Sequence, residues 1–417
     1  MRILKLTAAL VERLLAARER RDVQAETVAG KIIADVRRRG DTALFSWTKK
    51  LDGINLARQG IWVSQRELAE AQKSVSSDLL RAVKHAISNV RKVAEKQLPR
   101  DWSLEVEPGV SIGQMVRPIE TIGCYIPGGN ATLLSTLIMT AVPAQVAGAK
   151  RIVVACSNPN KELLAAAGIL GLSEIVRIGG AQAVAALAYG TETVPRVDKI
   201  FGPGNRFVTA AKQIVSRDCA IDLPAGPTEA IVIASHGNAS WIAADLLAQA
   251  EHAPDATSIL VTTSPRFARE VQREVTKQLE KLPKPNPARI ALKTTGAILL
   301  AASDDAAFNF VNRFAPEHLS LPQARAAALE KISAAGSVFV GPFAAQPLGD
   351  YASGSNHVLP TGAWGRSRGG LSAADFVKCI SVQTISRKGF HRLAGDVRVL
   401  AKAENLLGHD NAVGVRQ

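Results

Sequence analysis

Two side chains in segment 245–255 are of types that bind metal ions. Gln249 and His252 lie three residues apart in a stretch whose apolar residues have helical spacing, and Pro254 ends that stretch. Both side chains should therefore lie on one face near the end of a helix. An imidazole suits zinc and an amide oxygen can join it, although further ligands must come from elsewhere in the chain. Taken alone, such a pair more often consists of two side chains that merely face solvent.

Glu317 and His318 form a second candidate for chemistry. They stand next to each other between two apolar segments. A carboxyl beside an imidazole can transfer protons near neutral pH, which favours an acid–base pair. The alternative is a core histidine whose nitrogens are satisfied by backbone groups.

The last quarter of the chain adds three further polar candidates. The glycine-rich segment 349–357 contains Asp350 and His357, and such loops often carry function. A helix is predicted from about 387 to 407, and His409 follows it. A side chain placed there could fold back or reach a second subunit.

Composition indicates a globular protein of more than one domain. The chain has 417 residues, of which 47% are hydrophobic and 21% charged. Neither a secretory start nor a segment of membrane-spanning length is present, so we expect a cytoplasmic protein without a membrane partner. The four cysteines are far apart and lack CxxC spacing, which argues against a disulfide framework and a thiolate zinc site.

The formal net charge of +14 raises the question of nucleic-acid binding. Residues 1–100 hold 21 Lys and Arg against 11 Asp and Glu, so most of the excess lies there. Helical periodicity places these charges on solvated helix faces, aromatic residues are scarce and no base-reading motif occurs. We therefore expect no nucleic-acid partner; a basic surface also suits an anionic ligand.

From residue 120 onward, short apolar runs alternate with alanine-rich helical stretches, which predicts an α/β unit with a largely parallel sheet. The predicted strands are 121–126, 151–155, 174–178 and 198–201, and the predicted helices are 133–146, 161–170, 181–189 and 207–215. Glycines at 128–129, 179–180 and 202–204 follow three of these strands. Tight turns alone explain each of them, but three on one sheet edge favour a ligand crevice that suits a dinucleotide.

A second α/β set follows residue 230. Its predicted helices are 241–252, 265–282, 304–314 and 324–334, and its predicted strands are 258–262, 297–300, 318–321 and 337–340. The fold class is therefore α/β.

Eight motifs, in order along the chain, resemble the histidinol dehydrogenase family. They are GCYIPGG (123–129), GGAQ (179–182), DKIFGPGN (198–205), AGPTE (225–229), QAEH (249–252), PEH (316–318), GDYASG with NH (349–357) and ENLLGHDNA (404–412). The resemblance covers nearly the whole chain from residue 40, and the ordered set is far more specific than any one motif.

The resemblance implies an NAD-dependent, zinc-containing homodimer. It would oxidise L-histidinol to L-histidine through L-histidinal in two hydride transfers, the last step of histidine biosynthesis. The implied zinc ligands are Gln249, His252 and Asp350, with His409 of the partner subunit. The implied acid–base pair is Glu317 and His318, and the implied NAD contacts are Tyr125, Gln182 and Asn205. The implied substrate residues are Thr228, Gln249, His252, Glu317, His318, Asp350, Glu404 and His409, with His357 less securely placed.

The resemblance also implies a domain plan of two incomplete Rossmann-like domains with a helical N-terminal segment and a helical C-terminal tail. The expected parts are an N-terminal segment (1–22), a first α/β domain with the metal and catalytic residues (23–120 with 231–365), a second, NAD-binding domain (121–230) and a tail exchanged with the partner (366–417).

The sequence departs from the family pattern at a few positions. Thr228 stands where Ser is common, Ala315 where Gly is common, and segment 364–370 is more basic than expected. The basic segment keeps one alternative open, a related NAD-dependent dehydrogenase with the same zinc site that oxidises another small alcohol, for instance an anionic one paired with Arg366 or Arg368. A zinc hydrolase without a nucleotide would leave Tyr125 and Gln182 unexplained.

Overall fold

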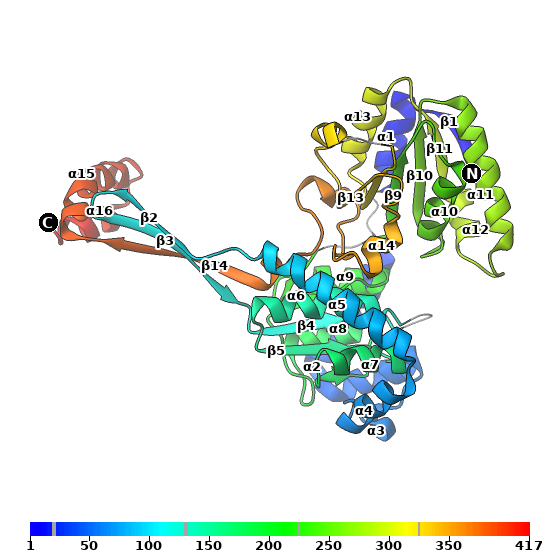
Figure 1. The fold of residues 1–417 in the computed structure, drawn as a ribbon. Helices are drawn as coiled ribbons and strands as arrows, with labels where there is room; N and C mark the ends of the chain where they lie inside the picture. The colour runs from blue at the N-terminus through cyan, green and yellow to red at the C-terminus, as the bar shows by residue number, and fades with distance from the viewer. Residues whose placement is uncertain (19–21, 129–131, 224–225, 324–325) are drawn as a thin grey trace.

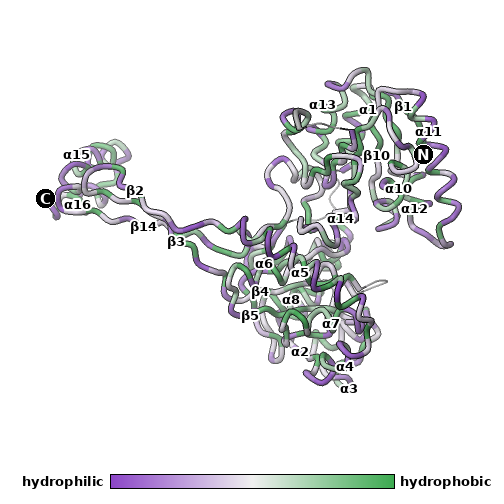
Figure 2. The backbone as a smooth tube through the Cα atoms, viewed as in Figure 1, coloured by the Kyte–Doolittle hydropathy of each residue, from purple (hydrophilic) through white to green (hydrophobic). Residues whose placement is uncertain are grey.

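The computed structural model describes residues 1–18, 22–128, 132–223, 226–323 and 326–417. Two α/β units lie next to each other, and a thin arm projects from them to carry the C-terminus (Figure 1). Hydrophobic positions gather in the two α/β units, as Figure 2 shows, and the outer helix α11 (Pro265–Lys281) is largely hydrophilic.

The first α/β unit along the chain is built on a five-stranded parallel sheet. Its strands are β4 (Thr121–Tyr125), β5 (Arg151–Ala155), β6 (Ile175–Val176), β7 (Lys199–Phe201) and β8 (Ala220–Ile221), in the order β6-β5-β4-β7-β8. The connecting helices are α6 (Leu134–Ala147), α7 (Lys161–Ile169), α8 (Gly180–Tyr189) and α9 (Arg206–Val215). The predicted parallel α/β organisation is confirmed here.

The second unit is built on a six-stranded parallel sheet in the order β1-β11-β10-β9-β12-β13. The strands are β1 (Arg2–Lys5), β9 (Glu229–Ile233), β10 (Thr257–Thr262), β11 (Ala297–Leu300), β12 (His318–Leu321) and β13 (Ser337–Val340). Its helices are α1 (Ala8–Ala16), α10 (Ala239–Ala250), α11, α12 (Ala288–Thr294), α13 (Asp304–Phe314) and α14 (Gln346–Tyr351). The N-terminal segment thus contributes an edge strand, β1, as well as a helix.

One helix of this unit was predicted incorrectly. Of the predicted helix 324–334, residues 324–325 lie outside the described part of the chain, and the rest holds only a 3-10 helix (Ala326–Lys331). Its alanines give it a helical pattern, but in the structure the crossover between the parallel strands β12 and β13 contains this 3-10 helix and no α-helix among the described residues.

Four N-terminal helices pack on the five-stranded unit. They are α2 (Val23–Asp52), α3 (Leu56–Gln59), α4 (Gln65–Ser74) and α5 (Ser77–Gln97). Helix α2 packs against α8 and α9, α4 against α7, and α5 against α6, so their apolar faces complete the cores of that unit. The expected domain plan groups residues 23–120 with 231–365, whereas these helices contact the five-stranded unit. An amphipathic helix shows which face it buries, not which of two sheets it covers, so its sequence could not decide this grouping.

The arm is a three-stranded antiparallel sheet capped by two helices. Its strands are β2 (Trp102–Glu107), β3 (Val110–Pro118) and β14 (Val377–Ile385), and its helices are α15 (Arg387–Ala403) and α16 (Leu407–Gly414). The expected helical tail therefore contains a long strand, and its residues pair with residues 259 to 275 positions earlier in the chain. Leu104, Val399 and Leu400 are each more than half exposed there, which leaves apolar surface uncovered in a single chain.

No helix among the described residues is long and apolar enough to cross a membrane.

The root of the arm is fixed to the five-stranded sheet by one aromatic pair. The Phe376 ring stacks on that of Phe201 at the end of β7, with centroids 3.9 Å apart and planes at 10°, and both side chains are fully buried. Replacing Phe376 by alanine should lower the free energy of unfolding by about 3–5 kcal/mol, because it leaves a cavity under the arm. Thermal and denaturant unfolding would measure this loss. Phe343→Ala is the matched control, because Phe343 is 78% exposed, and an equal loss in both variants would contradict the packing role.

Candidate active site

The predicted catalytic residues lie at the amino edge of the six-stranded sheet. The strand order changes direction at β9, since β10 and β11 follow on one side and β12 lies on the other. Thr228 immediately precedes β9, and His318 is the first residue of β12. Helix α10 runs back across the sheet between two parallel strands, so Gln249 near its C-terminus returns to this same edge.

A chain of hydrogen bonds joins Gln249 to Glu317. The Gln249 Nε2 group donates to Thr228 Oγ1, and Thr228 Oγ1 donates to Glu317 Oε2 over 2.5 Å. The backbone N–H of Glu229 donates to the same carboxylate oxygen over 2.9 Å. Glu317 is buried, and these two donors fix its orientation.

His318 lies between two carboxylates. Its Nδ1 atom is 3.5 Å from Glu317 Oε2 and 3.3 Å from the Glu229 carbonyl oxygen, and its Nε2 atom is 3.7 Å from Asp350 Oδ1. Within the described residues, Nε2 is buried without a hydrogen-bond partner. Burial lowers the pKa of His318, but the negative charges of Glu317 and Asp350 outweigh it and raise the pKa to about 10.

His357 connects this edge to the other α/β unit. Its Nδ1 atom is 2.9 Å from the backbone oxygen of Asp350, and its Nε2 atom is 3.2 Å from Thr136 Oγ1 on α6. Because α6 begins after the carboxyl end of β4, this contact brings the carboxyl side of the five-stranded sheet to the amino side of the six-stranded sheet. Burial lowers the pKa of His357, which favours its neutral form.

The remaining expected metal and substrate residues lie apart from this cluster. His252 is exposed just beyond α10, one turn from Gln249. Glu404 and His409 are exposed on the arm, which Figure 1 shows far from β9 and β13 of the same chain. Accordingly, the described residues of one chain bring no three His, Cys, Asp or Glu side chains together as a metal site.

The expected NAD contacts lie at the carboxyl edge of the five-stranded sheet. Tyr125 ends β4, and its hydroxyl accepts a hydrogen bond from Gly180 N over 3.1 Å. Gln182 Nε2 donates to Asp52 Oδ2 over 2.8 Å, while its Oε1 atom is buried without a partner among the described residues. Asn205 caps α9 after β7. Strand order reverses between β4 and β7, the point where ligands bind in open α/β sheets.

Close packing accounts for at least two of the conspicuous glycines. A Cβ atom on Gly179 would lie 2.8 Å from Ser157 Cβ, and one on Gly202 would overlap the carbonyl oxygen of Tyr125. Residue 129 of the first glycine turn lies outside the described part of the chain. The turns are therefore required by the fold whether or not phosphate binds them.

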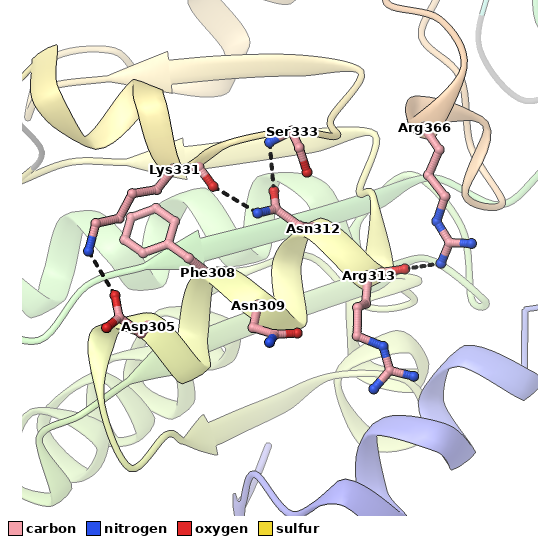
Figure 3. A pocket seen from close by; sticks show the side chains of 8 residues that line it. All are labelled: Asp305, Phe308, Asn309, Asn312, Arg313, Lys331, Ser333 and Arg366. Carbon is pink, nitrogen blue, oxygen red and sulfur yellow. Dashed lines mark hydrogen bonds and ion pairs between the residues drawn. The ribbon is translucent and has the colours of Figure 1, made fainter.

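Arg366 and Arg368, which could pair with an anionic alcohol as an alternative substrate, both contact other groups of the protein. Arg368 Nη2 contacts both carboxylate oxygens of Asp375 at 3.0 Å. Arg366 lies over a surface pocket beside α13, where its guanidinium donates to the backbone oxygen of Arg313 (Figure 3). Because both guanidinium groups already bind protein groups, they do not support an anionic substrate beside Glu317.

Sequence reasoning missed two residues of the site. The buried Glu229 side chain binds Arg18, and its backbone contacts both Glu317 and His318. Glu229 could have been found from the sequence, because it is the one acidic residue at the start of an apolar strand. For Arg18, in a basic N-terminal region, the sequence offered none.

Comparison with known proteins decides the family. The histidinol dehydrogenase family profile matches residues 15–417. The chain belongs to the histidinol dehydrogenase family. It is 43% identical to the histidinol dehydrogenase of Methanothermobacter thermautotrophicus over 98% of this chain and 97% of that one, and 44% identical to that of Geobacter sulfurreducens over 97% and 96%. The crystal structure of histidinol dehydrogenase from Elizabethkingia anophelis superposes with a TM-score of 0.93 at 38% identity, covering 100% of this chain and 98% of that one.

Membership in the histidinol dehydrogenase family makes the protein an oxidoreductase of histidine biosynthesis. The α/β fold class expected from the sequence is confirmed by the same structural match. The resemblance seen in the motifs is likewise confirmed.

The position of His318 between two carboxylates has a consequence for pH. Because its folded pKa is raised to about 10 from an ordinary value of 6.5, its protonation stabilises the fold fully below pH 6.5, and this stability is lost as pH rises through 10. In metal-free protein, the thermal midpoint should therefore fall between pH 7 and 10, and it should fall less in His318→Gln. Histidine NMR of the same samples should show one imidazole titrating far above the rest. An equal fall in both proteins would contradict the charged cluster.

Proposed function

We propose that the protein is a cytoplasmic homodimer that oxidises L-histidinol to L-histidine through L-histidinal, with NAD and zinc. The observation that carries this proposal is the chain of contacts Gln249–Thr228–Glu317–His318–Asp350, which His357 links to the unit with the nucleotide-type crevice. The acid–base pair and two metal-type side chains are thereby connected to the unit that carries the expected NAD contacts.

The donor set fits a zinc ion. Gln249 uses its amide nitrogen toward Thr228, so its amide oxygen is the atom left for a metal. Asp350 supplies a carboxylate and His252 an imidazole, and nitrogen and oxygen donors of this kind suit zinc. Bound zinc would hold the amino and imidazole nitrogens of the substrate and so orient its alcohol carbon. Gln249, His252 and Asp350 would hold it from one chain and His409 from the partner.

The crevice at β4 and β7 fits a dinucleotide. The unpartnered Oε1 atom of Gln182 is a buried acceptor that requires a donor, and NAD offers hydroxyl and amide groups. Tyr125 ends β4, and Asn205 caps α9 after β7, so they come from the two strand ends where the strand order reverses. NAD would accept the two hydrides from this side.

His318 and Glu317 divide the proton transfers. Bound NAD would supply the acceptor for both hydrides. His318 would take the hydroxyl proton of the alcohol, for which its own proton must first leave the ring. In the oxidation of the aldehyde, Glu317 would take a proton from the water that adds to it. Thr228 and the Glu229 N–H hold the Glu317 carboxylate in place for this role.

The arm provides the residues that one chain lacks at the site. Glu404 and His409 are exposed at its end, and apolar residues along it are uncovered. Exchange of arms in a two-fold dimer would bury that surface and bring both side chains to the partner's site.

A stoichiometric assay tests the function. Purified, zinc-loaded protein with limiting L-histidinol and excess NAD should form two NADH for each histidine. A ratio of one would mean release of the aldehyde, and no NADH would contradict the proposal.

The metal assignment makes a separate prediction. His252→Ala should lose zinc and activity together, because a ligand is removed from the site. His236→Ala is the control, since His236 follows β9 at the opposite edge of the sheet. Metal analysis and NADH formation measure both. Full zinc content in His252→Ala would contradict the assignment.

The proton-transfer roles are separable with two substrates. Glu317→Gln should slow oxidation of L-histidinal more than that of L-histidinol, since only the aldehyde step requires water. His318→Ala should slow the alcohol step and leave zinc content unchanged. Equal slowing of both steps by Glu317→Gln would contradict this division.

A further inference from the structure

A single guanidinium from the N-terminal segment contacts both β9 and the end of α13, the helix that precedes β12. Arg18 follows α1, and its Nε and Nη2 atoms donate to the two oxygens of the Glu229 carboxylate over 2.7 and 2.6 Å. Its Nη1 atom donates to the backbone oxygen of Phe314, and its Cζ atom lies 3.7 Å from the centroid of the Phe314 ring. The Arg18 side chain is 10% exposed and that of Glu229 6%.

One of these partners lies on the strand that contacts the acid–base pair, and the other lies at the start of the segment that leads to the pair. Glu229 opens β9, and its backbone N–H and carbonyl contact Glu317 Oε2 and His318 Nδ1. Phe314 ends α13, three residues before Glu317. Arg18 therefore ties the strand that orients the Glu317 carboxylate to the segment that carries it.

We propose that Arg18 is a positioning residue for the proton transfers, and that its link to both Glu229 and Phe314 sets the separation of Glu317 and His318 from the β9 backbone. This inference rests on the proposed roles of Glu317 and His318. Arg18 touches neither of them and acts through Glu229 and Phe314.

The guanidinium is chemically suited to this role. Its planar fork bonds a carboxylate with two nitrogens and leaves a third for the Phe314 carbonyl, which the single ammonium of lysine cannot reproduce. Lysine would still compensate the buried charge of Glu229. Arg18→Lys therefore keeps the charge and removes the geometry.

The test compares Arg18→Lys with Arg313→Lys in zinc-loaded protein. Arg313 on α13 pairs with Glu12 on α1 over 2.7 Å, so it joins the same two elements away from the site. Arg18→Lys should lower kcat roughly 10- to 100-fold, because small displacements of catalytic groups cost this much. Its KM for L-histidinol and its zinc content should be unchanged, because the metal-side residues do not contact Arg18. Arg313→Lys should change neither kcat nor KM.

A second variant covers the case in which Arg18→Lys does not fold. The pair Arg18→Met with Glu229→Gln removes the buried charges together but still lacks the link to Phe314, so its kcat should also be low. Wild-type kcat in any folded variant without the guanidinium would overturn the proposal, as would an effect on KM alone.

Measuring His318→Ala in parallel separates the proposed role of Arg18 from the proposed proton-transfer roles of Glu317 and His318. If His318→Ala and Arg18→Lys are both fully active, the proton-transfer roles themselves fail, whereas a slow His318→Ala beside a fully active Arg18→Lys refutes only the role of Arg18.

Discussion

A buried imidazole between two carboxylates is the interaction around which the site is built. His318 is nearly inaccessible to solvent, and Glu317 and Asp350 lie on either side of its ring. Such a cluster is stable only when each charged group has partners, because an unpaired buried charge costs several kcal/mol. Thr228 and the Glu229 N–H satisfy Glu317. The positions of β9, β12 and α14 follow from that requirement.

The two α/β units contribute opposite edges to the site. The five-stranded unit presents the carboxyl ends of its strands, where α/β sheets commonly bind ligands, and the six-stranded unit presents its amino ends. The contact between His357 and Thr136 joins the two edges. Hydride transfer requires the acceptor and the acid–base pair on two sides of one carbon, and this arrangement of edges is suited to it.

Local patterns predicted the parallel strands and most helices, because alternation of apolar runs reports local burial. The residues Glu317, His318 and Asp350 were found from their types and their glycine or proline contexts, and the structure brings them together. Contacts between segments that are distant in the sequence could not be predicted from it. The pairing of β14 with β3, the packing of α2 on α8 and the reach of Arg18 to Glu229 depend on surfaces that complement each other only after folding.

A site shared between two subunits can be tested by mixing two inactive variants. His252→Ala lacks a residue of the metal-side pair, and His409→Ala lacks the residue at the end of the arm. After subunit exchange, each mixed dimer should contain one site with both histidines intact and one with neither, so NADH formation from L-histidinol should return to at most half the wild-type activity per mixed dimer. If both ligands came from one chain, every site would still lack one of them. No recovery of activity, with exchange confirmed by differently tagged subunits, would contradict the shared site.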